Sequence, residues 1–98
     1  MTTEWVLVEV ADALAAPAAR GVAADFLRAV RTDPLFTVVG YDPAVFDRGF
    51  QLYAARPDKG WSLTDCVSFG VMTDHGLTTA LTADHHFFQA GFRAVFSN

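Results

Sequence analysis

The stretch LFTVVGYDPAVF, residues 35–46, indicates the fold class. Its first five residues are apolar or β-branched, which is typical of a short buried strand. Asp42 and Pro43 follow, and this pair predicts the N-cap and the first position of a helix. A buried strand that leads directly into a capped helix is the basic unit of an α/β protein.

The same alternation extends on both sides of this stretch. The apolar spacing predicts one helix at about residues 4–15, with Thr3 as its cap, and a second at 17–31. Further helices are predicted from residue 43 to a loop at 56–60, from 62 to 74 and from 84 to 89, and further strands at 79–82 and 92–96. Short, continuously apolar strands between helices predict an α/β fold with a parallel sheet.

Length and composition limit the chain to one small domain, residues 1–98. It has 98 residues, of which 52% are hydrophobic and 18% charged, so intrinsic disorder is excluded. No apolar run reaches the roughly 18 residues that a membrane helix needs. The apolar content is high for so short a chain, so we expect some of the apolar surface to be exposed or to lack its packing partner.

Charge and cysteine content narrow the function classes. The formal net charge is −4, which disfavours nucleic-acid binding by bulk electrostatics. An acidic chain can still act on phosphates when its carboxylates hold divalent cations, because the cation reverses the local sign of charge. Cys66 is the single cysteine, so no internal disulfide can form. A reducing, cytoplasmic location is therefore expected.

Three carboxylates occur in apolar surroundings. Glu9 interrupts an apolar helix, Asp65 lies in the first turn of the most apolar helix, and Asp84 follows a predicted strand. Ligands in open α/β sheets bind at the carboxyl ends of strands, and Asp84 is predicted to lie at such an end. These three acids are the candidate catalytic residues.

Each acid also has a structural explanation. Ser62 and Asp65 have the spacing of a capping box, in which each side chain binds the backbone N–H of the other residue. Asp84 has a suitable position to cap the short helix that follows it. Glu9 lies at the border of the polar side of its helix, where a solvated side chain is common. The residues alone leave both interpretations open, and a capping residue can also bind a ligand.

Several segments together resemble the PIN-domain family of VapC-type toxin ribonucleases. The segment KGWSLTDCVSF at residues 59–69, ALTADHHF at 80–87 and AGF at 90–92 are similar to the C-terminal half of that family. The opening segment TTEWVLVE at residues 2–9 resembles the family's middle helix, which carries a glutamate. The resemblance covers essentially the whole chain, and the segments containing Asp65 and Asp84 are its most specific part.

The resemblance implies a PIN-like three-layer α/β/α fold and a metal-dependent endoribonuclease. It places the acidic site at Glu9, Asp65 and Asp84, as ligands of Mg²⁺ or Mn²⁺, with Ser62 or Thr64 supporting the site by hydrogen bonding. His86 falls where some members of the family have another acid. The implied partners are an RNA substrate and an antitoxin protein.

One departure from the family pattern is large. The family begins with a strand that carries its first aspartate, and no such strand precedes Met1 in this sequence. We therefore expect an N-terminally incomplete domain, whose remaining strands cannot form the usual continuous sheet. Two explanations are open: an incomplete reading frame, or a short variant that completes its core by pairing with another chain, which implies a homo-oligomer. The alternative function is a catalytically silent module that acts by protein–protein interaction or self-association. A third interpretation is an unrelated α/β protein whose acids only cap helices.

Overall fold

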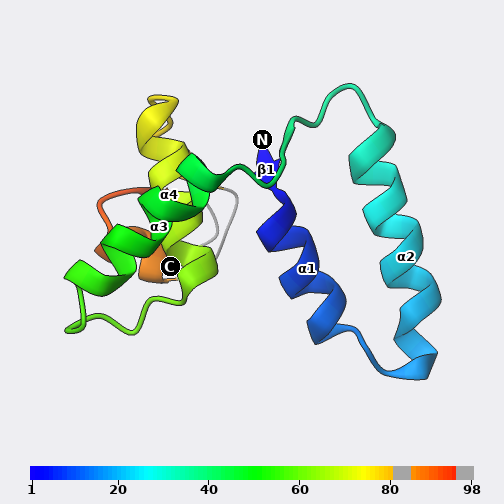
Figure 1. Cartoon of the computed structure of the whole chain (residues 1–98). Coiled ribbons are helices and arrows are strands. Elements are labelled where there is room, and N and C mark those ends of the chain that lie inside the picture. Colours follow the sequence, from blue (N-terminus) through cyan, green and yellow to red (C-terminus); the bar gives the residue numbers. More distant parts are fainter. Residues whose placement is uncertain (81–84, 95–98) are drawn as a thin grey trace. The chain divides into compact units, whose positions relative to one another are not determined.

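A computed structural model describes residues 1–80 and 85–94 of the chain (Figure 1). The chain divides into two compact units, residues 1–41 and residues 42–98, and each is described by itself. The expectation of one domain over residues 1–98 stays a prediction.

The first unit contains two helices and one pair of parallel strands. Its elements are β1 (Thr2–Thr3), α1 (Glu4–Ala13), α2 (Pro17–Thr32) and β2 (Val38–Val39). In the β1–β2 pair Thr2 lies opposite Val38 and Thr3 opposite Val39. Thr3 also caps α1, because its hydroxyl accepts a hydrogen bond of 3.2 Å from the Val6 N–H. The two predicted helices and the predicted cap are confirmed.

The strand predicted at residues 35–39 is shorter than expected. Only Val38 and Val39 are in a strand, and 87% of Leu35 is exposed. A turn after α2 explains the difference, because the Leu35 N–H donates to the Asp33 carboxylate (2.9 Å) and the Phe36 N–H to the Asp33 carbonyl (3.0 Å). The partner strand β1 was not predicted, since two threonines ahead of a helix give a capping signal and no strand periodicity.

The second unit contains α3 (Pro43–Ala55), α4 (Leu63–Asp74), β3 (Thr79–Ala80), α5 (His85–Gln89) and β4 (Arg93–Ala94). β3 and β4 are parallel, with Thr79 opposite Arg93. Within the described residues the strands thus form two separate parallel pairs. The prediction of short parallel strands between helices is confirmed, while residues 81–84 and 95–98, which include parts of the predicted strands and Asp84, lie outside the described residues.

The core of the second unit forms where α4 meets its neighbours. α3 packs closely on α4 at Gly49, where a Cβ atom would come within 2.8 Å of the Val67 Cα. Trp61, Cys66 and Phe69 form the buried cluster, against which partly buried apolar side chains pack: Leu52, Phe87, Ala90 and Phe92. α4 therefore carries most of the core and has its first turn next to α5.

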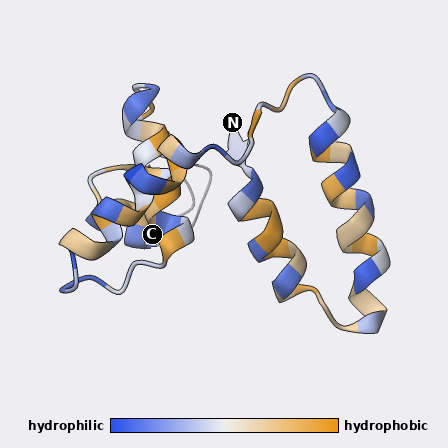
Figure 2. Cartoon of the chain, in the orientation of Figure 1, coloured by the Kyte–Doolittle hydropathy of each residue, from blue (hydrophilic) through white to orange (hydrophobic). Residues whose placement is uncertain are grey.

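Polar and apolar residues alternate along the helices of the first unit, most clearly along α2 (Figure 2). α2 is 16 residues long and carries three arginines and an aspartate. Over the part of the chain that the structure describes, no helix has both the length and the apolar character needed to cross a membrane.

Candidate functional site

Asp65 is fixed at the start of α4 by a reciprocal capping box. The Ser62 hydroxyl accepts a hydrogen bond from the Asp65 N–H (3.0 Å), and Asp65 Oδ2 accepts one from the Ser62 N–H (3.1 Å). The predicted capping interaction is thus confirmed. The carboxylate also lies in the first turn of the helix, near the positive end of the helix dipole, where acidic side chains are common. Local sequence therefore brings this carboxylate to the start of α4.

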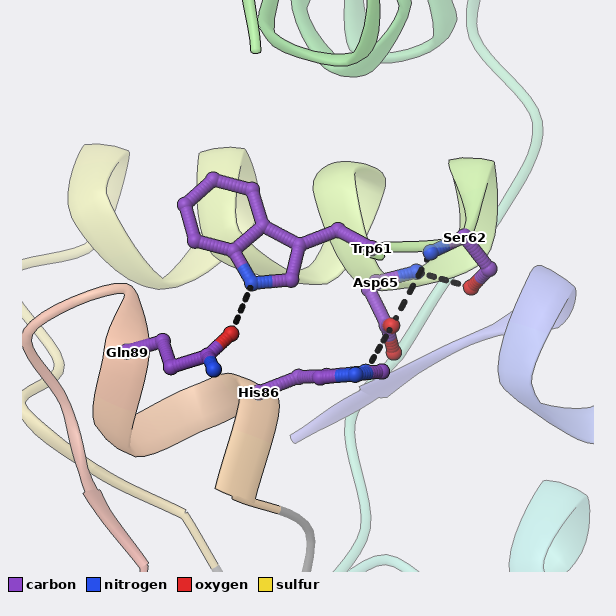
Figure 3. A network of polar contacts seen from close by, with 5 residues as sticks. All are labelled: Trp61, Ser62, Asp65, His86 and Gln89. Atoms are coloured by element: carbon purple, nitrogen blue, oxygen red, sulfur yellow. Dashed lines mark hydrogen bonds and ion pairs between the residues drawn. The ribbon is translucent and has the colours of Figure 1, made fainter. Parts of the chain in front are cut away.

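A second side chain reaches the same carboxylate oxygen from α5. His86 Nδ1 lies 3.1 Å from Asp65 Oδ2, although the two residues are 21 positions apart (Figure 3). The side chains are only 24% and 12% exposed, so the pair is largely shielded from solvent. An ionised carboxylate only accepts hydrogen bonds, so a hydrogen bond here requires the His86 tautomer that carries a proton on Nδ1.

The other carboxylate oxygen of Asp65 is left open. Oδ1 accepts no hydrogen bond from the residues that the structure describes, whereas Oδ2 accepts two. Every fully buried side-chain nitrogen or oxygen among these residues has a partner, so Oδ1 is not completely buried. Asp65 thus has one oxygen held by two hydrogen bonds and one oxygen that the described residues leave without a hydrogen bond.

Aromatic packing supports the position of α5 beside α4. The Trp61 indole N–H donates to Gln89 Oε1 at 3.2 Å (Figure 3). Phe69 packs edge-on against Phe87, with ring centroids 4.9 Å apart. The α5 residues in these contacts, Phe87 and Gln89, directly follow His86 on the same short helix. The imidazole is therefore held by its own helix as well as by Asp65.

An exposed ion pair lies beside the buried tryptophan. The Arg56 guanidinium lies over the Trp61 ring, 5.4 Å from its centroid, and bonds both carboxylate oxygens of Asp58. The hydrogen bonds from Arg56 hold the pKa of the Asp58 carboxyl at about 2. Arg56 thus has its charge partner in Asp58, and the pair closes the loop ahead of α4.

Cys66 follows Asp65 but is not a reactive group. Its side chain is fully buried in the core cluster. Burial raises the pKa of the thiol, and the negative charge of Asp65 raises it further. A buried thiol with a raised pKa is a poor nucleophile, so Cys66 acts as a small apolar core residue.

The other predicted site residues are placed as follows. Thr64 is half-buried in the first turn of α4, beside Asp65 in the sequence. Glu9 is exposed on α1, in the first unit. Asp84 lies outside the described residues. Among the described residues, no group of three or more His, Cys, Asp or Glu side chains is arranged to hold a metal ion. The structure brings Ser62 to Asp65, and the assignment of Glu9 and Asp84 stays a prediction.

The contact between Asp65 and His86 was not predicted from the sequence. The resemblance to PIN-domain proteins indicates only that His86 falls where some members of that family have another acid. A contact between residues so far apart depends on how α5 packs on α4, which short-range patterns do not report. The sequence offered one signal for His86: it lies two residues after Asp84, which is itself a candidate site residue.

Comparisons with known proteins gave a match in structure but not in sequence. No family model matches the chain, and no curated protein matches it. The chain is similar to a solved structure described as the Mycobacterium tuberculosis VapC20, a toxin that cleaves the sarcin–ricin loop. The TM-score is 0.87 and the sequence identity 26%, over 97% of this chain and 72% of the other.

This likeness defines the class of fold. The helix-rich chain with short parallel strands has a PIN-like α/β fold of the VapC kind. The expected fold class is thereby confirmed.

Proposed function

We propose that the protein is a PIN-type endoribonuclease that depends on Mg²⁺ or Mn²⁺ and hydrolyses phosphodiester bonds of single-stranded RNA. One observation carries the proposal. The Asp65 carboxylate is largely buried, has Oδ2 held by two hydrogen bonds and has Oδ1 without a hydrogen bond from the described residues. The fold that holds it is shared with VapC20, a toxin that cleaves the sarcin–ricin loop.

The donor chemistry of Asp65 fits a hard divalent cation. Such cations prefer carboxylate oxygens and keep several of their waters. We assign Glu9, Asp65 and Asp84 as catalytic ligands, directly or through water, with Ser62 and Thr64 in support. The cation would lower the pKa of a bound water and polarise a phosphoryl oxygen. The carboxylates would act as ligands of the cation and would not act as proton shuttles.

The remaining parts of the proposal concern partners and location. As in toxin–antitoxin pairs, we propose an antitoxin protein as a binding partner, and self-association of the chain. The proposed location is the cytoplasm, where RNA is available and the lone Cys66 stays reduced.

The variant Asp65→Asn tests the proposal. Asparagine keeps an oxygen that can accept from the Ser62 N–H, so the cap is retained while the negative charge is lost. We expect the unaltered protein to cleave a single-stranded RNA in Mn²⁺, and both EDTA and Asp65→Asn to abolish cleavage. Unfolding in urea, measured in parallel, controls for loss of structure. Cleavage that persists in EDTA or in Asp65→Asn would contradict the proposed function.

A second candidate function is the catalytically silent interaction module. It is favoured by apolar side chains that the fold leaves exposed. Val22 and Phe26 lie one turn apart on α2 and are 72% and 51% exposed. If this function holds, Mn²⁺ will not change the melting temperature. A monomer in size-exclusion light scattering would count against the self-associating form of the module.

A further inference from the structure

We infer that His86 is a positioning residue that orients the Asp65 carboxylate toward the divalent cation. The inference rests on the proposed function, because it assigns His86 a role at the same site. It goes beyond that function by giving a role to a residue that is not itself a proposed ligand. The class of ligand concerned is a hard divalent cation, Mg²⁺ or Mn²⁺.

Two hydrogen bonds from different elements reach the same oxygen of Asp65. The Ser62 N–H and His86 Nδ1 both bond Oδ2 of Asp65, at 3.1 Å each. One donor leaves the carboxylate some freedom to turn about its Cβ–Cγ bond. Two donors from different elements, the loop before α4 and the helix α5, restrict this rotation further and with it the position of Oδ1. Oδ1 is then presented in one orientation.

A histidine at position 86 also suits the charge of the proposed site. An acidic side chain at position 86 would repel the Asp65 carboxylate and add a further negative charge to the site. The imidazole of His86 donates a hydrogen bond without adding negative charge. It therefore orients Asp65 while leaving the charge on its carboxylate available to the cation. Hydrogen-bond partners of this kind commonly change the metal affinity of a carboxylate ligand by about 10- to 100-fold.

Packing of the neighbouring α5 residues on α4 and on Trp61 holds His86 in place. Its neighbour Phe87 packs on Phe69 of α4, and Gln89 accepts from the Trp61 indole. A positioning residue must be more rigid than the group it orients. α5 has only five residues, so these packing contacts are needed to keep its first turn against Asp65.

The main experiment measures Mn²⁺ affinity by titration calorimetry, without RNA. We expect His86→Ala to weaken Mn²⁺ binding by about 10-fold or more. His86→Asn should recover much of the affinity, because its amide N–H can take the place of Nδ1–H. Phe88→Ala is the matched control, because this exposed residue lies on the same short helix and we expect parental affinity.

A second measurement needs no metal. Nitrogen NMR of the imidazole should show His86 in the tautomer protonated at Nδ1, and Asp65→Ala should remove this preference. Equal populations of the two tautomers in the parent protein would contradict the inferred hydrogen bond and overturn the inference.

The outcomes separate the two proposals. If the parent binds Mn²⁺ and Asp65→Asn does not, while His86→Ala binds as tightly as the parent, the role of His86 is wrong and the metal site stands. Equal weakening by Phe88→Ala and His86→Ala would also overturn the inference, because the effect would then come from α5 as a whole. If the parent itself binds no Mn²⁺, the proposed function fails and the inference fails with it.

Discussion

At the scale of single residues, Asp65 has a structural and a proposed chemical role. Its Oδ2 closes the capping box with Ser62, while its Oδ1 accepts no hydrogen bond from the described residues. The two interpretations left open by the sequence are therefore compatible, because they use different oxygens of one carboxylate. Removal of the cap at Ser62 should consequently lower stability, while removal of the charge at Asp65 should abolish the proposed cation binding.

The cap can be tested through Ser62. Ser62→Ala removes the acceptor for the Asp65 N–H, and we expect it to lower the free energy of unfolding by about 1 kcal/mol. Ser62→Thr keeps a hydroxyl at this position and should stay within about 0.5 kcal/mol of the parent. Urea unfolding followed by circular dichroism measures both. An unchanged stability in Ser62→Ala would show that the cap contributes nothing.

At the scale of elements, the close packing of α3 on α4 depends on the absence of a side chain. Gly49 is buried in the middle of α3, where a Cβ would lie within 2.8 Å of the Val67 Cα. Glycine lowers helix stability, so its presence here has a packing reason. The contact fixes α4, and α4 carries Asp65.

Alanine at two glycines should therefore have opposite effects. Gly49→Ala should lower the free energy of unfolding by about 1–3 kcal/mol, because the added methyl group forces α3 away from α4. Gly21→Ala, in the interior of α2 with no atom within 4 Å of the new Cβ, should raise it by about 0.5–1 kcal/mol. Chemical denaturation of both variants makes the comparison. A stabilising Gly49→Ala would contradict the close packing.

At the scale of the whole molecule, binding of a cation is linked to stability. A ligand that binds only the folded protein adds to the free energy of unfolding, by about 2.7 kcal/mol at a hundred times its dissociation constant. For a chain of this length, about 1 kcal/mol corresponds to a change in melting temperature of about 4–8 °C. The proposed site therefore has a consequence that can be measured without RNA.

Mn²⁺ at a hundred times its dissociation constant should raise the melting temperature by about 10–20 °C. The rise should be absent in Asp65→Asn and reduced in Glu9→Gln, because each substitution removes the charge of a proposed ligand. EDTA should reverse the effect. Differential scanning calorimetry provides the measurement, with Ca²⁺ as a second cation for comparison. An equal rise in Asp65→Asn and the parent would place the binding elsewhere.

The sequence by itself determined the features that depend on neighbouring residues. The helices appear close to the predicted positions, since Thr3, Asp42 and Ser62 all act as caps and Pro17 and Pro43 begin helices. The capping box of Asp65 was also predictable, because both partners lie within one turn. These features need only short-range hydrogen bonds and backbone preferences.

Only the tertiary structure decided the features that join distant segments. The pairing of β1 with β2, the outward position of Leu35 and the contact of His86 with Asp65 were not predicted. Each depends on which element packs against which, and that follows from the burial of apolar side chains over the whole unit. Phe87 on α5 brings His86 to Asp65 by packing on Phe69, and no local pattern around His86 specifies this contact.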